Sequence, residues 1–403
     1  MAVDTLLERI NDYASRPDPY PLYAELREVG VARQTDGSYL VGGYYDIAAL
    51  FHDPRLSSDR RNRAAEFAAP MPQQPSFIQL DDPEHHRLRG LATRPFGPPH
   101  SPGRVDAMRG EITGITDQLI ASLQGRTRID IVDDFAYPLP VTVICRLLGV
   151  PRDDEPVFHT WATTIIDSLD LTSGADHDER TRAADRAREE MGRYLVGLAE
   201  QRRGRPGDDM LSAFINAPKP AALTHDELAA TAVLLLIAGH ETTVNLITNG
   251  VLTLLRHPDQ LDLLRREPAL LPGAVEELLR YEPPVQLLPQ RTPLTDLEVA
   301  DTTIPKGVPV VLVLASGNRD PKRFRDPDRF DPTRPDNQHL GFGSGIHICY
   351  GAPLARIEAQ IALGALIPRL GTATLVEDPP PYRHSPVLRG PRHLPIELSP
   401  SRG

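Results

Sequence analysis

The chain has 403 residues, a net charge of −11, 40% hydrophobic residues and 25% charged residues. These are ordinary values for a globular protein, so they exclude disordered and fibrous classes, and the negative charge argues against a nucleic-acid-binding surface. Proline, at 41 residues, is about twice as frequent as usual and is spread along the chain, which indicates long, stiff loops rather than a linker.

The sequence also bears on location. The first 23 residues carry acidic side chains and no apolar core, which is not typical of a signal peptide or an anchor. The longest apolar run, Leu228–Gly239, has 12 residues and is too short for a bilayer. Cys145 and Cys349 lie far apart in the sequence, so no disulfide framework is expected. We therefore expect a soluble cytoplasmic protein with no membrane anchor.

Helical patterns dominate the first two thirds of the chain. A short helix over Pro21–Glu28 and a β-prone stretch at Ser38–Val41 come first. Further helices are predicted over Glu84–Thr93, Arg104–Leu123, Phe135–Leu148, Glu155–Leu169 and Asp178–Arg202. The next helix opens with a capping box, Thr224-His-Asp-Glu227, and runs to about Arg256. At 1.5 Å per residue it would be ~50 Å long, so we expect it to cross the middle of the molecule.

The last third alternates helical, β-prone and irregular segments. Helices are predicted over Leu271–Tyr281 and Gly351–Leu370, and strands over Leu297–Val299 and Val308–Leu314. The Pro/Asp/Arg-rich stretch Asn318–Asn337 lacks periodicity, and such long irregular segments tend to be functional. A hairpin-like pattern with its tip at Pro386–Arg389 follows. The fold class is mainly α with small β sheets and no clear domain break.

The segment Gly341–Gly351 is the most informative. Cys349 stands in a glycine-rich loop just ahead of a helix that begins near Gly351. Backbone N–H groups at a helix start favour a thiolate, which predicts a lowered pKa. Gly341, Gly343 and Gly345 would let the backbone approach something flat and bulky. A buried structural cysteine beside a glycine turn explains this segment, taken alone, equally well.

The long helix carries polar residues inside its apolar pattern, at Ala238-Gly239-His240-Glu241-Thr242-Thr243. Buried polar groups cost energy unless they are satisfied, and a threonine can bond back to the i−4 carbonyl. His240-Glu241 invites comparison with the zinc motif H-E-x-x-H, but Val244 occupies the second histidine position, so that interpretation fails. A kink made only for packing remains the alternative.

Two other patterns are ambiguous by themselves. Glu277 and Arg280 share a helix face, which fits a surface ion pair of little energetic value. His85 and Arg89 lie one helical turn apart and suit a ligand bearing a carboxylate, although a solvated basic face explains them as well. Arg291 is an isolated arginine in an apolar neighbourhood.

Taken together and in this order, the segments resemble the bacterial cytochrome P450 family. Phe342–Gly351 matches the haem-ligand loop F-G-x-G-x-H-x-C-x-G, Glu277–Arg280 matches the E-x-x-R helix, and Ala238–Thr243 matches the oxygen-groove pattern A-G-x-E-T-T. The Asp82–Arg89 helix start and Asn318–Phe324 are weaker matches. The resemblance covers about residues 18–403 and implies a single P450 domain over the whole chain.

The resemblance implies haem b as the cofactor and a role for each matching residue. Cys349 would be the axial thiolate ligand of the iron, and Glu241 and Thr242 would be the catalytic acid–alcohol pair. Glu277 and Arg280 would form a buried structural network that locks the 318–337 stretch. The remaining cofactor-binding residues would be His85, Arg89, Arg291 and His347 at the propionates, Phe342 on the thiolate side, and Ala238, Gly239 and Gly351 close to the haem.

Two positions depart from the usual pattern. Gly90 stands where a second arginine is common, and Tyr350 follows the cysteine where an aliphatic residue is usual. The second cysteine, Cys145, is expected to be a core residue without a catalytic role.

The function implied is that of a haem-thiolate monooxygenase that hydroxylates or epoxidises an apolar or amphipathic small molecule of secondary metabolism, such as an antibiotic intermediate. The chain lacks a flavin or iron–sulfur motif, so electrons would come from a ferredoxin and a ferredoxin reductase. Oxidative coupling or ring closure, a peroxide-driven enzyme and a non-catalytic haem protein are the alternatives. The cationic residues expected to dock the electron donor are His86, Arg87, Arg89 and Arg356. The segments expected to contact substrate are Arg61–Phe77, Ile165–Leu195, Leu235–Val244, Val285–Leu288 and Pro386–Leu388.

Overall fold

The structure is a computed structural model that describes residues 5–68, 74–97, 101, 103–166, 168, 175–218 and 222–398. Its α-helices are α1 (Leu6–Asn11), α2 (Tyr20–Val29), α3 (Tyr44–Leu50), α4 (Glu84–Thr93), α5 (Arg104–Ala107), α6 (Arg109–Ser122), α7 (Pro138–Leu148), α8 (Glu155–Ile166), α9 (Ala175–Glu200), α10 (Met210–Ile215), α11 (His225–Arg256), α12 (Pro258–Arg266), α13 (Leu271–Tyr281), α14 (Leu314–Gly317) and α15 (Ala352–Leu370). The strands are β1 (Val31–Arg33), β2 (Tyr39–Val41), β3 (Leu56–Ser57), β4 (Arg128–Asp130), β5 (Leu288–Pro293), β6 (Leu297–Val299), β7 (Thr302–Ile304), β8 (Val310–Leu312), β9 (Thr374–Leu375) and β10 (Pro395–Glu397).

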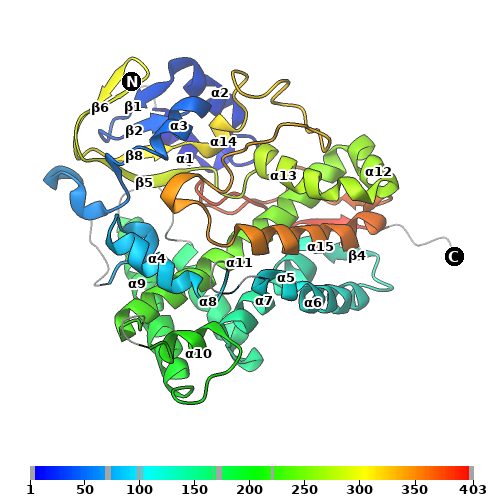
Figure 1. The fold of residues 1–403 in the computed structure, drawn as a ribbon. Helices are drawn as coiled ribbons and strands as arrows, with labels where there is room; N and C mark the ends of the chain where they lie inside the picture. Colours follow the sequence, from blue (N-terminus) through cyan, green and yellow to red (C-terminus); the bar gives the residue numbers. More distant parts are fainter. Residues whose placement is uncertain are drawn as a thin grey trace.

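The long helix α11 organises the fold. Its N-terminus has the predicted capping box between Thr224 and Glu227, and its 32 residues span ~48 Å. Figure 1 shows it crossing the middle of the molecule, where it packs against α7, α9, α13 and α15. Among the described residues, α11 is also the one helix that is long and apolar enough to cross a membrane. Its continuous apolar run, Leu228–Gly239, is shorter than a bilayer requires. Two thirds of its most apolar window are buried inside the fold.

The strands form three small sheets. The largest has the order β1-β2-β8-β5-β3, and in it β2 pairs with β8 in parallel while the other pairs are antiparallel. Strands β4, β10 and β9 make the second sheet, and β6 and β7 make the third. The C-terminal hairpin is present as predicted, because Arg383 N–H donates to Gly390 O and Arg392 N–H donates to Pro381 O. The mainly α fold with small β sheets is confirmed.

Some predicted boundaries need correction. The helix predicted over Arg104–Leu123 is broken at Met108 into α5 and α6. The helix predicted from Phe135 begins earlier, as a π-helical turn, η5 (Val132–Ala136), and α7 follows it. Helix α8 ends at Ile166, and Leu169, the predicted end, lies outside the described residues. Helices α1, α3, α10, α12 and α14 were not predicted.

Candidate functional site

The glycine-rich loop presents Cys349 at the start of α15. The Cys349 N–H donates to Phe342 O at 2.8 Å, and a 3₁₀ turn, η8 (Gly345–His347), lies between these two residues. Gly345 has a φ of +68°, and an added Cβ would lie 2.3 Å from Phe51 O. This glycine is therefore required by the packing of the loop on the protein itself, a reason that differs from the predicted approach to a flat ligand.

The predicted lowering of the Cys349 pKa is wrong for the protein alone. Although Cys349 as a residue is exposed, its thiol is surrounded by protein atoms, and this desolvation raises the pKa of the thiol. The N–H groups of Gly351 and Ala352 and the charges of Arg89 and Arg356 oppose the shift without outweighing it. The predicted helix-start effect is present, but desolvation is larger.

Four nitrogen-bearing side chains meet beside this loop. The rings of His85, on α4, and His347 lie 4.2 Å apart between centroids. Burial lowers the pKa of His347 to about 3, and the neighbouring Arg291, His85 and Arg89 lower it further. Burial also lowers the pKa of Arg291, on β5, to about 10. The sequence analysis assigned these four residues to one site, and the structure brings them together.

These groups fit the two propionates of haem b. The Nε2 atom of His85 and the Nδ1 atom of His347 are buried and have no hydrogen-bond partner among the described residues, which is costly unless a ligand supplies one. Each could donate to a carboxylate, and Arg89 and Arg291 add the charge that a pair of carboxylates requires. Ser58 Oγ, 2.9 Å from His347 Nε2, fixes the orientation of that ring.

The polar segment of α11 lies within an otherwise largely buried helix. Ala238, in this segment, is exposed. The Thr242 hydroxyl donates to Ala238 O at 2.8 Å, which confirms the predicted bond to the i−4 carbonyl. Gly239 permits close packing on α7, because an added Cβ would lie 3.1 Å from Ile144 Cδ1.

The acid of this segment has a partner that the sequence did not predict. Glu241 is 2% exposed, and its Oε1 lies 2.5 Å from Arg383 Nε in the C-terminal hairpin. The neighbouring His240 is also buried and packs edge-on against Tyr137 at 5.0 Å. Burial lowers the pKa of His240 to about 3, so the imidazole is neutral near pH 7.

Glu277 and Arg280 form a buried network rather than a surface pair. Both are fully buried, and Arg280 donates to Glu277 through Nε and Nη2 at 2.8 and 2.7 Å. Arg280 also donates to the carbonyl oxygens of Asn318, Pro327 and Arg329, within the irregular 318–337 stretch. The stretch is therefore held by hydrogen bonds to α13, as the resemblance implied.

The unusual Tyr350 ties the cysteine loop to α4. Its hydroxyl donates to Ala92 O at 2.7 Å, and its ring stacks on Phe96 at 4.6 Å. Two contacts of Arg356, on α15, were not predicted from the sequence. Arg356 forms a two-point ion pair with Glu276 and lies over the ring of Phe342 at 4.6 Å.

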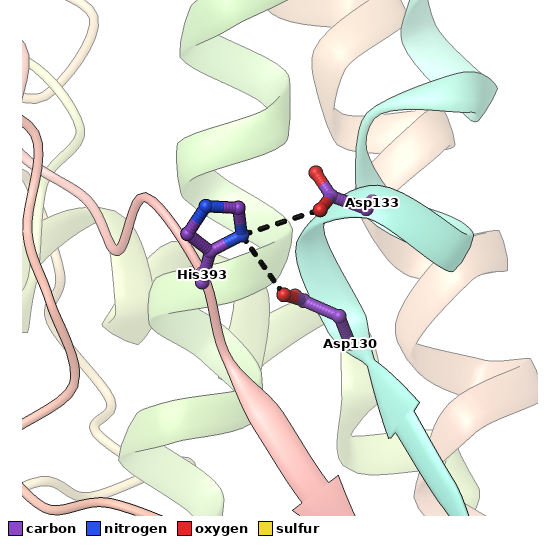
Figure 2. Close-up of side chains that lie close together, drawn as sticks. All are labelled: Asp130, Asp133 and His393. Atoms are coloured by element: carbon purple, nitrogen blue, oxygen red, sulfur yellow. Dashed lines mark hydrogen bonds and ion pairs between the residues drawn. The ribbon is translucent and has the colours of Figure 1, made fainter.

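A separate cluster joins the second sheet to the start of the η5 turn. Figure 2 shows the His393 ring facing the carboxylates of Asp130 and Asp133, and its Nδ1 lies 3.0 and 3.2 Å from them. Asp130 also accepts the N–H groups of Val132 and Leu394. These bonds pin the C-terminal β10 to β4 and take no part in the site above.

A loop cysteine, a cationic site for anions and a threonine bonded back to the backbone of the central helix are together typical of a haem-thiolate protein. The cytochrome P450 family model matches residues 29–397. The chain is 41% identical to the cytochrome P450 monooxygenase PikC of Streptomyces venezuelae, over 96% of this chain and 92% of that protein. It is 38% identical to the 6-deoxyerythronolide B hydroxylase of Saccharopolyspora erythraea, over 94% and 96% of the two chains.

The comparison with solved structures agrees. The ligand-free structure of Mycobacterium smegmatis CYP164A2 superposes with a TM-score of 0.89 at 40% identity, and the match covers 97% of this chain and 99% of that one. The chain belongs to the cytochrome P450 family. It is a P450 monooxygenase with haem b as its cofactor and acts on small-molecule substrates.

Proposed function

We propose that this monooxygenase hydroxylates or epoxidises an apolar or amphipathic product of secondary metabolism, bound against the 238–242 face of α11. The observation that carries the proposal is the bond from the Thr242 hydroxyl to the exposed Ala238, beside the paired acid Glu241. We further propose that a single P450 domain in the cytoplasm carries out the reaction.

The residues around the cofactor have separate tasks in this proposal. Cys349 would ligate the iron, and haem with a thiolate ligand would supply the chemistry of O–O bond cleavage when bound. His85, Arg89, Arg291 and His347 hold the propionates through charge-assisted hydrogen bonds. Phe342 packs on the thiolate side, where Arg356 fixes its ring. Ala238 and Gly239 would also lie close to the haem, and Gly351, with no atom within 4 Å of an added Cβ, would permit its close approach.

Thr242 and Glu241 control protons. The Thr242 hydroxyl proton is committed to Ala238 O, so its oxygen lone pairs are available to accept a hydrogen bond from a donor in the pocket. The Glu241 carboxylate is buried and held by Arg383, whose side chain is 21% exposed. Arg383 therefore connects the acid with solvent, and movement of Arg383 would let the Glu241 carboxylate collect a proton and pass it toward Thr242.

Electrons enter from a ferredoxin at the face that carries the cysteine loop. Two of the four predicted docking cations are compensated within the protein, because Arg87 pairs with Glu227 and Arg356 pairs with Glu276. Ile346 and Ile348, on the loop itself, are 51% and 47% exposed. We propose that these apolar side chains carry much of the contact, so the salt dependence of reduction is shallower than four free cations would give.

The test measures product and hydrogen peroxide per reducing equivalent, after a spectral titration has identified a ligand. Thr242→Ala should bind haem and substrate normally yet make mostly peroxide and little product. Thr248→Ala is the matched control, because its hydroxyl makes the same i−4 bond on α11, to Val244 O, at a fully buried position. Full coupling in Thr242→Ala, or product formation only with added peroxide, would contradict the proposal.

A further inference from the structure

A run of three arginines lies just after β3, in the turn η2 (Arg60–Asn62) and the residue that follows it. The middle one, Arg61, is satisfied, because its Nε donates to both carboxylate oxygens of Asp59 at 2.9 and 2.7 Å. Arg60 and Arg63 differ from it. Within the part of the chain that the structure describes, neither makes a side-chain hydrogen bond or an ion pair, and the Nε atom of each is buried.

A third guanidinium approaches them from α9. Burial lowers the pKa of Arg60 to about 10, and the positive charges of Arg63 and Arg188 lower it further. Burial also lowers the pKa of Arg63 and of Arg188. Within the described residues, the carboxylate paired with a member of this group is that of Asp185, 2.8 Å from Arg188 on the same helix and 56% exposed. Arg60 and Arg63, which are half-buried, have no acid partner in this part of the chain.

Such an arrangement is unfavourable without a further anion. A sheltered charge that lacks a partner is costly, and an arginine does not escape by losing its proton, because its pKa remains far above neutral. The guanidinium group binds planar or tetrahedral oxyanions by parallel N–H donors. The cluster therefore matches a carboxylate or a phosphate.

The position of the cluster indicates which molecule brings that anion. Ser58, two residues before Arg60, contacts His347 of the propionate site, and β3 pairs with β5, which carries Arg291. The charges that repel Arg60 are those of Arg63 and Arg188, whereas those that repel His347 are Arg291, His85 and Arg89. The two cationic clusters are thus neighbours with separate members.

We propose that Arg60, Arg63 and Arg188 bind the carboxylate or phosphate of an otherwise apolar substrate and so orient its chain toward the haem. The proposal rests on the proposed function for the location of the substrate. It adds that the substrate is an anionic amphiphile, whereas the aliphatic segments of the pocket alone suggested a hydrophobic one.

The experiment uses the haem-loaded protein and four dodecyl probes: dodecanoic acid, dodecyl phosphate, methyl dodecanoate and dodecyltrimethylammonium. Binding is measured by calorimetry and by the ferric spectrum. The wild type should bind the two anions at least about tenfold more tightly than the ester, and the cation least. The tighter of the two anions identifies the headgroup.

Variants assign the preference to the cluster. Arg60→Gln, Arg63→Gln and Arg188→Gln should each weaken anion binding about tenfold and leave ester binding unchanged. Arg55→Gln is the matched control, since this arginine lies outside the expected substrate-contact segments, is 56% exposed and is paired with Asp53, and it should change neither. Equal affinity for ester and anions in the wild type, or no binding of any probe, would overturn the proposal.

Two further outcomes separate this inference from the proposed function. If the arginine variants lose haem while keeping the wild-type preference for anions, the cluster holds a propionate and the proposal is wrong. If anions bind tightly by calorimetry but no substrate is ever oxygenated, the proposed function fails and the anion site stands.

Discussion

Replacement of Glu277 by glutamine should destabilise the protein severely. The carboxylate accepts two bonds from Arg280, two from Arg334, one from Asn337 Nδ2 and one from the Asp331 N–H. Glutamine has the same size as glutamate but no charge. Its amide N–H₂ would face N–H groups that the carboxylate now accepts. A buried ion pair broken on one side costs about 3–5 kcal/mol, and here two buried guanidinium groups lose their counter-ion.

The adjacent Glu276 provides the comparison for this substitution. Its side chain is 28% exposed and pairs with Arg356 and His339, so Glu276→Gln should cost roughly 1–2 kcal/mol, between exposed and buried pairs. Urea unfolding, followed by circular dichroism and haem absorbance, measures both variants. Since total stability is typically about 5–15 kcal/mol, Glu277→Gln should lose a large share of it and much of its haem. Equal unfolding midpoints for the two variants would refute this reasoning.

Three further expectations concern single groups. Cys349→Ser should abolish the strongly red-shifted carbon-monoxide band of the reduced protein, whereas Cys145→Ser, at a buried core position on α7, should retain it. Arg383→Gln should slow turnover as Glu241→Gln does, with wild-type substrate affinity in both; a normal rate in Arg383→Gln would contradict the role of the ion pair. Burial raises the pKa of Glu358 from 4.5 to about 8, so the folded state keeps a proton that the unfolded state loses. As the pH rises from 4.5 to 8, the free energy of unfolding should therefore fall by about 1.4 kcal/mol per pH unit. Glu358→Gln should remove this pH dependence in urea titrations at pH 5 to 8.

Local chemistry made parts of the fold predictable. The boundaries of α4 and α13 were predicted to the residue, and the start of α11 followed from its capping box. The sequence signal failed where one residue has two meanings. The predicted end of α11 near Arg256 is confirmed, but the proline that follows is also favoured in the first turn of a helix, and the unpredicted α12 begins at Pro258.

The candidate site divides in the same way. The family motifs predicted Cys349, Thr242, His85, Arg89 and His347 as site residues, because each motif is short and has fixed spacing. The Glu241–Arg383 ion pair joins residues 142 positions apart, and no periodicity encodes such a contact. The unpaired state of Arg60 and Arg63 was equally hidden, since Arg61, with the same side chain in the same run, is fully satisfied.

The C-terminal hairpin combines two properties in one element. It carries Arg383, which holds Glu241, and Leu388, which forms a β-bridge to Val285, the first residue of the segment Val285–Leu288 that we expect to contact substrate. A substitution that reshapes the tip for a new substrate would also move the counter-ion of the buried acid. Laboratory evolution of this enzyme toward new substrates through residues 384–388 should therefore trade specificity against efficient use of electrons, whereas changes in segments remote from the hairpin would alter specificity alone.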